Sequence, residues 1–267
     1  MVSGMWKRVG ISIRYFRYLF QASGPHAIHS PFVFELMQQV LRDKSGYDPW
    51  LPIENLRRSL RADPRSIAVR DFGAGPLGGK GSPQRISKIA RIAAKPSKYG
   101  KLLFRIARHF KPDSILELGT SLGLSTAYLS ASCPDARVIT LEGSPETARI
   151  AGENLKSLGL QKVQVVVGEF GETLPEILSS LDRLGLVFLD GNHKKEPTLQ
   201  YFHWCLSKAT PYSIFILDDI HWSREMEEAW KEVTGHDSVT LSIDLFFLGL
   251  VFFRKEFRSK EHFILRV

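Results

Sequence analysis

The run ILELGTSLG at residues 115–123 constrains the fold of this chain more than any other feature. An apolar strand leads into a Gly-x-x-x-Gly turn, and the residues that follow have the pattern of a helix. Gly119 and Gly123 let the backbone come close to a ligand at the carboxyl edge of a sheet, where open α/β folds bind ligands. The free N–H groups of a helix that begins near Gly123 favour an anion, here a carboxylate.

Strand and helix patterns alternate after this turn. Short apolar runs typical of strands covered on both faces lie at Ser114–Leu118, Arg137–Leu141, Val163–Val167, Leu186–Leu189 and Ile214–Leu217. Helical patterns lie between them, at about 123–132, 145–158, 172–181, 196–208 and 222–233. The last two runs, Ser238–Ile243 and Phe246–Phe253, are separated by two residues and indicate an antiparallel pair. We therefore expect a Rossmann-like α/β fold with a mostly parallel seven-stranded sheet, an antiparallel last strand and an N-terminal helical extension.

The N-terminal part is basic. Residues 1–111 hold 21 Lys and Arg against 6 Asp and Glu, a net charge of +15, whereas residues 112–267 hold 15 against 22. We expect a basic helical or lid extension over residues 1–97 and a ligand-binding domain over residues 98–267. The aromatic, basic segment Ile11–Phe20 can lie on an anionic membrane, bind RNA or pack over its own domain.

Gly-rich sequence at 71–83 contains GAGPLG at residues 73–78, which fits the dinucleotide-binding pattern literally. Pro76 and the glycines that follow do not open a helix, and the sequence about twenty residues later is basic instead of acidic, so we interpret the segment as a loop. The two cysteines match no metal or redox spacing. The most apolar run, at 245–253, is far too short to cross a bilayer, and the N-terminus has no signal-peptide pattern, so we expect a cytoplasmic protein.

The next strand, VITLE, ends in Glu142, which lies 19 residues after Gly123, where an acid would accept both ribose hydroxyls of an adenosine. With both motifs in place, residues from about Lys98 to Phe253 resemble class I S-adenosylmethionine-dependent methyltransferases of the catechol and caffeoyl-CoA O-methyltransferase-like branch. The segments ILELGTSLGLSTAYLS and VITLEGSPETARIAGENLKSLGL carry this resemblance. It implies that Glu117 and Gly119 line the methionine end of the cofactor, Ser125 contacts its carboxylate, Glu142 binds the ribose and Gly168-Glu169 flanks the adenine. The full implied set of cofactor contacts is Glu117, Gly119, Thr120, Ser121, Gly123, Ser125, Glu142, Gly143, Gly168, Glu169 and Asp190.

Acidic residues end the fourth and fifth of these predicted strands, Asp190 in FLDGNH and Asp218-Asp219 in ILDD. Neighbouring parallel strands would bring three carboxylates to one edge, and such a group suits Mg²⁺. The resembling metal-dependent enzymes carry acids at the positions of Asp190 and Asp218, an Asn where this chain has Asp219, and a Lys where it has His193. His193, Asp190 and the adjacent Lys194 are therefore the candidate catalytic residues, and helix capping and loop hydrogen bonds are the structural alternative.

These observations predict an S-adenosylmethionine-dependent enzyme that methylates oxygen of a small or lipid-like acceptor, with Mg²⁺ assistance as a further expectation. The sequence leaves room for a peripheral membrane contact through the N-terminus and for a homodimer. Nucleic acid is the less favoured substrate, because the Asn/Asp-Pro-Pro-aromatic tetrad is absent after the fourth strand. Two alternatives stay open: an RNA methyltransferase that uses the basic N-terminus, and a cofactor-binding interaction module without catalysis.

Overall fold

The chain forms two compact units, which are described separately. The computed structural model describes residues 2–24, 28–70, 81–92, 95–257 and 259–266, and for residues 2–9 only the backbone. The terminal unit comprises Met1–Arg42 and Val187–Val267, and the central unit comprises Asp43–Leu186. Residues 71–80 of the Gly-rich segment lie outside the described residues, so its expected loop stays a prediction. The expected domain division between residues 97 and 98 also stays a prediction.

The main sheet has the strand order β10-β8-β9-β7-β6-β3-β4-β5. Strand β9 runs antiparallel to both of its neighbours, whereas β3, β4 and β5 pair in parallel, as does β10 with β8. The predicted Rossmann-like class with one antiparallel strand is confirmed, and β10 adds a strand that the sequence patterns did not predict. The bounds are β3 (Ser114–Leu118), β4 (Arg137–Glu142), β5 (Gln164–Val167), β6 (Leu184–Leu189), β7 (Ala209–Asp218), β8 (Leu241–Asp244), β9 (Leu248–Phe252) and β10 (Glu261–Ile264).

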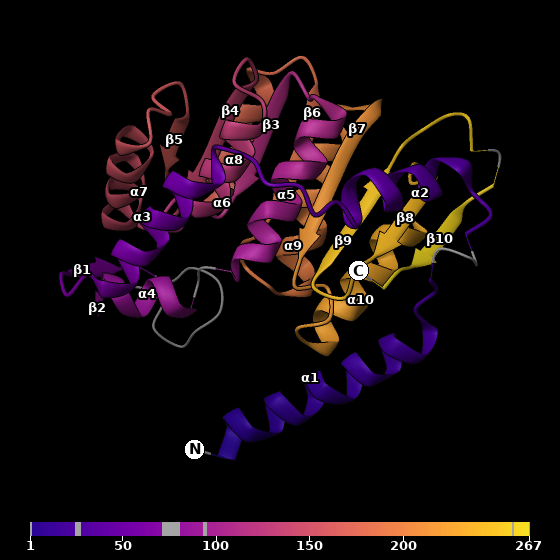
Figure 1. The fold of residues 1–267 in the computed structure, drawn as a ribbon, viewed down its shortest axis with the longest axis horizontal. Coiled ribbons are helices and arrows are strands. Elements are labelled where there is room, and N and C mark those ends of the chain that lie inside the picture. Colours follow the sequence, from indigo (N-terminus) through magenta and orange to yellow (C-terminus); the bar gives the residue numbers. More distant parts are fainter. Residues whose placement is uncertain (1, 25–27, 71–80, 93–94, 258, 267) are drawn as a thin grey trace. The chain divides into compact units, whose positions relative to one another are not determined.

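The central unit holds β3, β4 and β5 with their flanking helices (Figure 1). All five residues of β3 are buried, as expected for a strand covered on both faces. A two-stranded antiparallel sheet of β1 (Ser66–Val69) and β2 (Ser82–Arg85) follows α3 in the chain. The helices are α3 (Trp50–Ala62), α4 (Ile86–Ile92), α5 (Ser97–Phe110), α6 (Leu124–Ser132), α7 (Pro145–Ser157) and α8 (Phe170–Ser179). One apolar cluster joins α3 to α7, with Phe104, Tyr128 and Ile150 fully or almost fully buried in it.

The terminal unit joins the two ends of the chain. Ser23 forms a parallel bridge with Leu265, just after β10, and the ring of Phe32 meets that of Phe252 of β9 edge to face at 5.4 Å. Helix α2 follows Ser30 with Pro31 as its first residue, and a π-helical turn, η2, continues it. The helices of this unit are α1 (Val2–Gln21), α2 (Pro31–Leu36), η2 (Met37–Leu41), α9 (Lys195–Leu206) and α10 (Arg224–Gly235). None of the described helices has the length and apolar character that a membrane span requires.

Candidate functional site

Two strand ends in the central unit present carboxyl groups, one buried and one half-buried. Because β3 and β4 pair in parallel, with Glu117 opposite Thr140 and Leu118 opposite Leu141, their carboxyl ends lie at one edge of the sheet. Glu117 is the fourth residue of β3 and is completely buried, and Glu142 is the last residue of β4. The predicted ligand edge therefore carries two acids on neighbouring strands.

Burial dominates the chemistry of Glu117. Desolvation raises its pKa to about 7, although the hydroxyls of Ser125, Thr126 and Thr140 act in the opposite direction. Oε2 accepts hydrogen bonds from the Thr126 and Thr140 hydroxyls, the latter at 2.7 Å. Oε1 is buried too and has no hydrogen-bond partner among the described residues. A buried carboxylate oxygen without a partner is expected to accept a hydrogen bond from a ligand. A positively charged donor group would form the strongest such bond.

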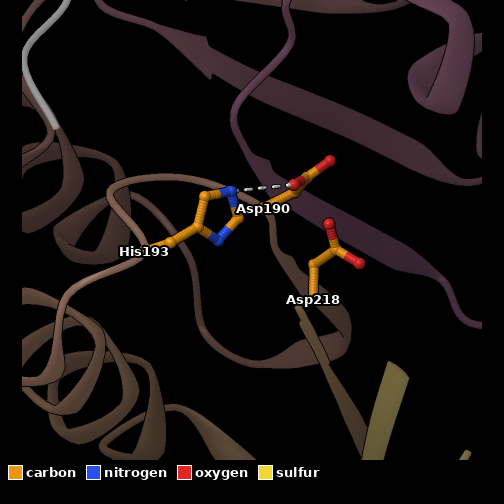
Figure 2. Close-up of side chains that lie close together, drawn as sticks. All are labelled: Asp190, His193 and Asp218. Carbon is orange, nitrogen blue, oxygen red and sulfur yellow. Dashed lines mark ion pairs between the residues drawn. The ribbon is translucent and has the colours of Figure 1, made fainter. Parts of the chain in front are cut away.

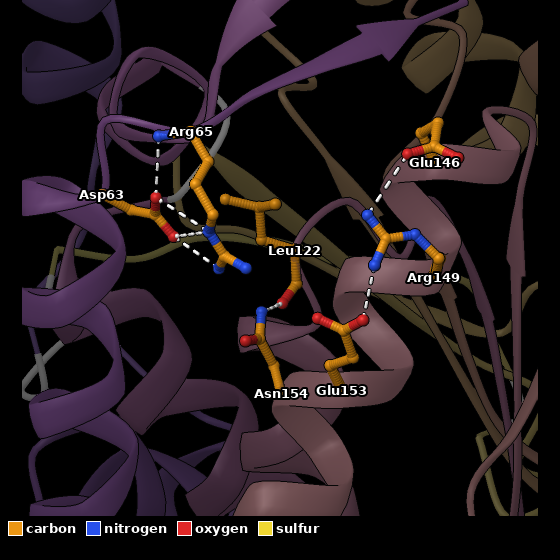
Figure 3. Close-up of polar contacts among 7 residues, drawn as sticks. All are labelled: Asp63, Arg65, Leu122, Glu146, Arg149, Glu153 and Asn154. Atoms are coloured by element: carbon orange, nitrogen blue, oxygen red, sulfur yellow. Dashed lines mark hydrogen bonds and ion pairs between the residues drawn. The ribbon is translucent and has the colours of Figure 1, made fainter.

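The turn after β3 contains several residues with positive φ values. Gly119 and Gly123 have φ values of 106° and 81°, a region that favours glycine, and Ser121 also has a positive φ of 48°. The side chain of Asn154 on α7 donates to the Leu122 carbonyl at 2.9 Å, which fixes the middle of the turn (Figure 3). An added Cβ at Gly123 would meet the Ala151 Cβ at 3.4 Å, an ordinary contact, so it is the backbone conformation that favours glycine here.

Glu142 connects this turn to the end of β4. Its Oε2 accepts the Ser121 N–H at 2.8 Å and its Oε1 accepts the Ser144 N–H at 2.9 Å. Burial raises the pKa of Glu142, and these backbone N–H groups oppose that rise. The Gly143 N–H acts in the same direction. A carboxylate has about four acceptor sites, so Glu142 keeps capacity for a ligand hydroxyl beside these three N–H groups.

Asp190 belongs to the terminal unit, and the other remaining predicted cofactor residues lie in the same unit as these two acids. Thr120 is buried, and its hydroxyl lies 2.6 Å from that of Thr140. Its side chain therefore forms a hydrogen bond inside the protein. Gly168 follows β5 with a φ of 149°, and its N–H donates to the Glu142 carbonyl at 3.0 Å. Glu169 is the N-cap residue of α8. Direct contact of these residues with a cofactor stays a prediction, as it does for Gly143 and Ser125.

A second group of polar side chains lies in the terminal unit. Asp190 follows β6, Asp218 ends β7, and His193 lies in the loop before α9. One potential ligand atom from each of the three lies within 4.8 Å of the others (Figure 2). His193 Nε2 is 3.7 Å from Asp190 Oδ1, too far for a hydrogen bond but suitable for two ligands of one ion. Adjacent ligands of an octahedral ion with bonds of about 2.1 Å are separated by roughly 3 Å, and opposite ligands by roughly 4 Å.

The structure brings His193 into this cluster, and Asp219 does not belong to it. Asp219 has a φ of 52°, and its N–H donates to the Phe247 carbonyl at 2.7 Å. Lys194 is exposed and is the N-cap residue of α9. The metal role predicted for Asp219 and the catalytic role predicted for Lys194 therefore stay predictions.

Two residues near the cluster were missed by the sequence reasoning. Asn192 has a left-handed φ of 54°, and its Oδ1 is buried without a hydrogen-bond partner in the described part of the chain. His221 lies between two acids, with Nε2 2.7 Å from Asp244 Oδ2 and Nδ1 3.0 Å from Glu227 Oε1. An Asn directly after a Gly at a strand end is a usable signal for such a turn, whereas the partners of His221 come from separate segments that no sequence spacing connects.

Comparisons with known proteins agree with this geometry. Residues 116–220 match a family described as a methyltransferase domain. A catechol O-methyltransferase of Niastella koreensis is 32% identical over 132 residues, which cover 48% of this chain and 58% of that protein. A catechol O-methyltransferase of Mycobacterium tuberculosis is 33% identical over 136 residues, covering 50% and 60%. The chain thus spans about three fifths of the length of these curated relatives.

The fold comparison covers more of the chain. The O-methyltransferase of Bacillus cereus in complex with SAH has a TM-score of 0.56 and 18% sequence identity, and the match covers 81% of this chain and 99% of that one. At this identity the likeness concerns the fold alone. Over about half of its length the chain is therefore similar in sequence to catechol O-methyltransferases, as the motifs predicted.

Proposed function

We propose that this protein transfers a methyl group from S-adenosylmethionine to an oxygen atom of a small-molecule acceptor. The observation that carries the proposal is the pair of acids at the ends of β3 and β4, the buried Glu117 and the half-buried Glu142, beside a turn with three positive φ values. The names of the relatives, catechol O-methyltransferases, support oxygen as the methylated atom and a small molecule as the acceptor.

The residues of the central unit fit this cofactor. The cofactor carries an ammonium group, which would provide the donor that the buried Oε1 of Glu117 lacks. The ribose hydroxyls would use the remaining acceptor capacity of Glu142, while Ser121 and Ser144 keep its carboxylate in place. Gly119 leaves room for the ligand next to the backbone. When bound, the cofactor supplies an electrophilic methyl group on a sulfonium.

The cluster of Asp190, His193 and Asp218 fits a divalent cation. Two carboxylates with one imidazole suit Mg²⁺ or Mn²⁺, and the imidazole favours the transition metal of the two. A bound cation would lower the pKa of an acceptor hydroxyl. The protein's own part is to orient the acceptor with these side chains and to accept its proton, for which His193 and Lys194 are the candidates. We also propose that Mg²⁺ assists the transfer and that the acceptor can be a lipid-like molecule.

A binding experiment and a transfer experiment together test the proposal. Calorimetry should detect binding of S-adenosylmethionine, and a labelled methyl group should reach catechol-type acceptors. Asp190→Asn should lower turnover more than tenfold, whereas Glu225→Gln, which changes an exposed acid in the same unit, should not. Adding a chelator separates cation-assisted transfer from transfer by His193 alone.

Three outcomes would contradict the proposal at different levels. Absence of cofactor binding would refute the cofactor assignment. Binding without transfer to any acceptor in a cell extract would favour the interaction module. Transfer to RNA, with a steep dependence on salt, would favour the RNA methyltransferase that the basic N-terminal part suggests.

A further inference from the structure

Helix α1 presents an apolar stripe to solvent. Ile13, Phe16 and Phe20 follow one another at spacings of three and four residues, so they share one face of the helix. Their exposed fractions are 58%, 61% and 89%, unusually large for three neighbouring large apolar side chains. Arg17 is exposed at the edge of this stripe. In the sequence, the same spacing continues toward the N-terminus with Val9 and Trp6.

The other side of α1 is fixed to the terminal unit. Tyr18 is buried, and its hydroxyl donates to the Leu265 carbonyl. The rings of Tyr15 and Tyr18 lie 4.9 and 5.3 Å from that of Phe246, and Arg14 Nε is 3.3 Å from Glu227 Oε2. One face of α1 therefore packs on the terminal unit. The apolar stripe on the opposite face is exposed although the helix has these contacts. Contiguous exposed apolar surface of this kind marks an interaction site.

The charges of α1 indicate what covers the stripe. Its twenty residues include Lys7, Arg8, Arg14 and Arg17 and not one Asp or Glu. Pairing with the same stripe of a second copy would bring like charges together with no acid on either helix to neutralise them. An anionic lipid surface provides both an apolar layer for the aromatic rings and negative headgroups for the basic residues.

We propose that α1 is an interfacial helix that binds the protein to anionic membrane surfaces through Ile13, Phe16, Phe20 and Arg17. The described helices include none that could span a bilayer, so the contact is peripheral. The helix would lie in the plane of the headgroups with its apolar stripe immersed, while the face with Tyr18 stays on the protein. This inference is independent of the methyl-transfer reaction, because it uses no residue of the proposed cofactor or cation sites.

Vesicle binding of the full chain tests the proposal. The protein is sedimented with vesicles of phosphatidylcholine alone and of phosphatidylcholine mixed with phosphatidylglycerol. We expect binding to the mixed vesicles only, and it should weaken as salt is raised. The double variant Phe16→Ser/Phe20→Ser should bind more than about tenfold more weakly, because burying two phenylalanine rings contributes most of the affinity. Arg17→Glu should reduce binding to the mixed vesicles.

The matched control is Tyr212→Ser, which removes an aromatic side chain that is 83% exposed on β7. It should bind vesicles like the unaltered protein, and circular dichroism should show that all variants are folded. The proposal is wrong if the unaltered protein does not bind the anionic vesicles or if the double variant binds them equally well. A concentration-dependent dimer that the double variant abolishes, without vesicle binding, would assign the stripe to a second copy instead.

Discussion

Replacing Glu117 by Gln tests the cofactor site most directly. The variant keeps the shape of the side chain and its ability to accept hydrogen bonds from Thr126 and Thr140, but it can no longer ionise. Because burial raises the pKa of Glu117 to about 7, half of the unliganded protein carries a neutral carboxyl group at that pH. An ammonium ligand needs the ionised form, so cofactor affinity should rise with pH through this range.

The magnitude follows from the ionised fraction and from the interaction that is lost. With a pKa of about 7, the ionised fraction changes roughly tenfold between pH 6 and pH 8, and affinity should change in proportion. A hydrogen bond to a charged group contributes about 1.5–3 kcal/mol, so Glu117→Gln should weaken binding at pH 8 by roughly ten- to a hundredfold. Its residual affinity should depend much less on pH.

The same substitution makes a prediction for the unliganded protein. A carboxyl group whose folded pKa is raised from 4.5 to about 7 loses its contribution to stability as the pH rises between these values. The shift corresponds to roughly 3 kcal/mol. Glu117→Gln should therefore melt at a higher temperature than the unaltered protein at pH 8, with a smaller difference near pH 4.5.

Calorimetry with S-adenosylhomocysteine between pH 6 and pH 8, in two buffers of different ionisation enthalpy, measures affinity and the protons released together. The ligand's own amino group titrates equally in both proteins, so their difference reports Glu117. Glu172→Gln, an exposed acid on α8 of the same unit, controls for the loss of one charge. Equal pH dependence in the unaltered protein and in Glu117→Gln would refute the reasoning.

Three further predictions concern other residues. His193→Ala should lower the affinity for Mn²⁺ by more than Asp219→Ala does, measured by calorimetric titration, because only His193 belongs to the cluster. Burial alone would lower the pKa of His221, but Asp244 and Glu227 raise it above 6.5, so stability should fall as the pH rises through that raised value. Thermal melting should show that His221→Gln lacks this fall. Gly123→Ala forces a side chain into a φ of 81° and should destabilise the protein by about 1–2 kcal/mol in denaturant titration.

The central strands were predictable because their signals are local. β3 has the predicted bounds Ser114–Leu118, and β4 and β5 differ from prediction by one residue at one end, since each is an apolar run closed by a Gly or an acid. Strand β10 was missed because Glu261–Ile264 is short and mixes polar and apolar residues, and it is formed by pairing with β8 at the sheet edge. Helix α3 was missed because Pro52 and several arginines interrupt its apolar pattern.

The cofactor motif could be predicted from the sequence because its signals are local as well. The contacts inside the motif could not be predicted. The positions of Gly119 and Glu142 relative to strand ends can be read from spacing. The hydrogen bond from Ser121 N–H to Glu142 depends on the path of the turn, and that from Thr140 to Glu117 depends on the register between β3 and β4. Such contacts join separate segments, so they could not be predicted from residue spacing. The pKa of Glu117 depends on these contacts and on complete burial, so it could not be predicted either.

The candidate cation cluster shows which contacts adjacency in the sequence does not specify. Asp218 and Asp219 are neighbours, and counting carboxylates at strand ends assigns both to one ion. Here the left-handed backbone at Asp219 ends β7, and its N–H is used by the Phe247 carbonyl. The left-handed residue before His193, Asn192, turns the loop after β6, and the imidazole Nε2 lies 3.7 Å from Asp190 Oδ1. In the proposed cation site, His193 supplies the third ligand atom from three positions after Asp190, and an imidazole in such a site favours metals that accept nitrogen.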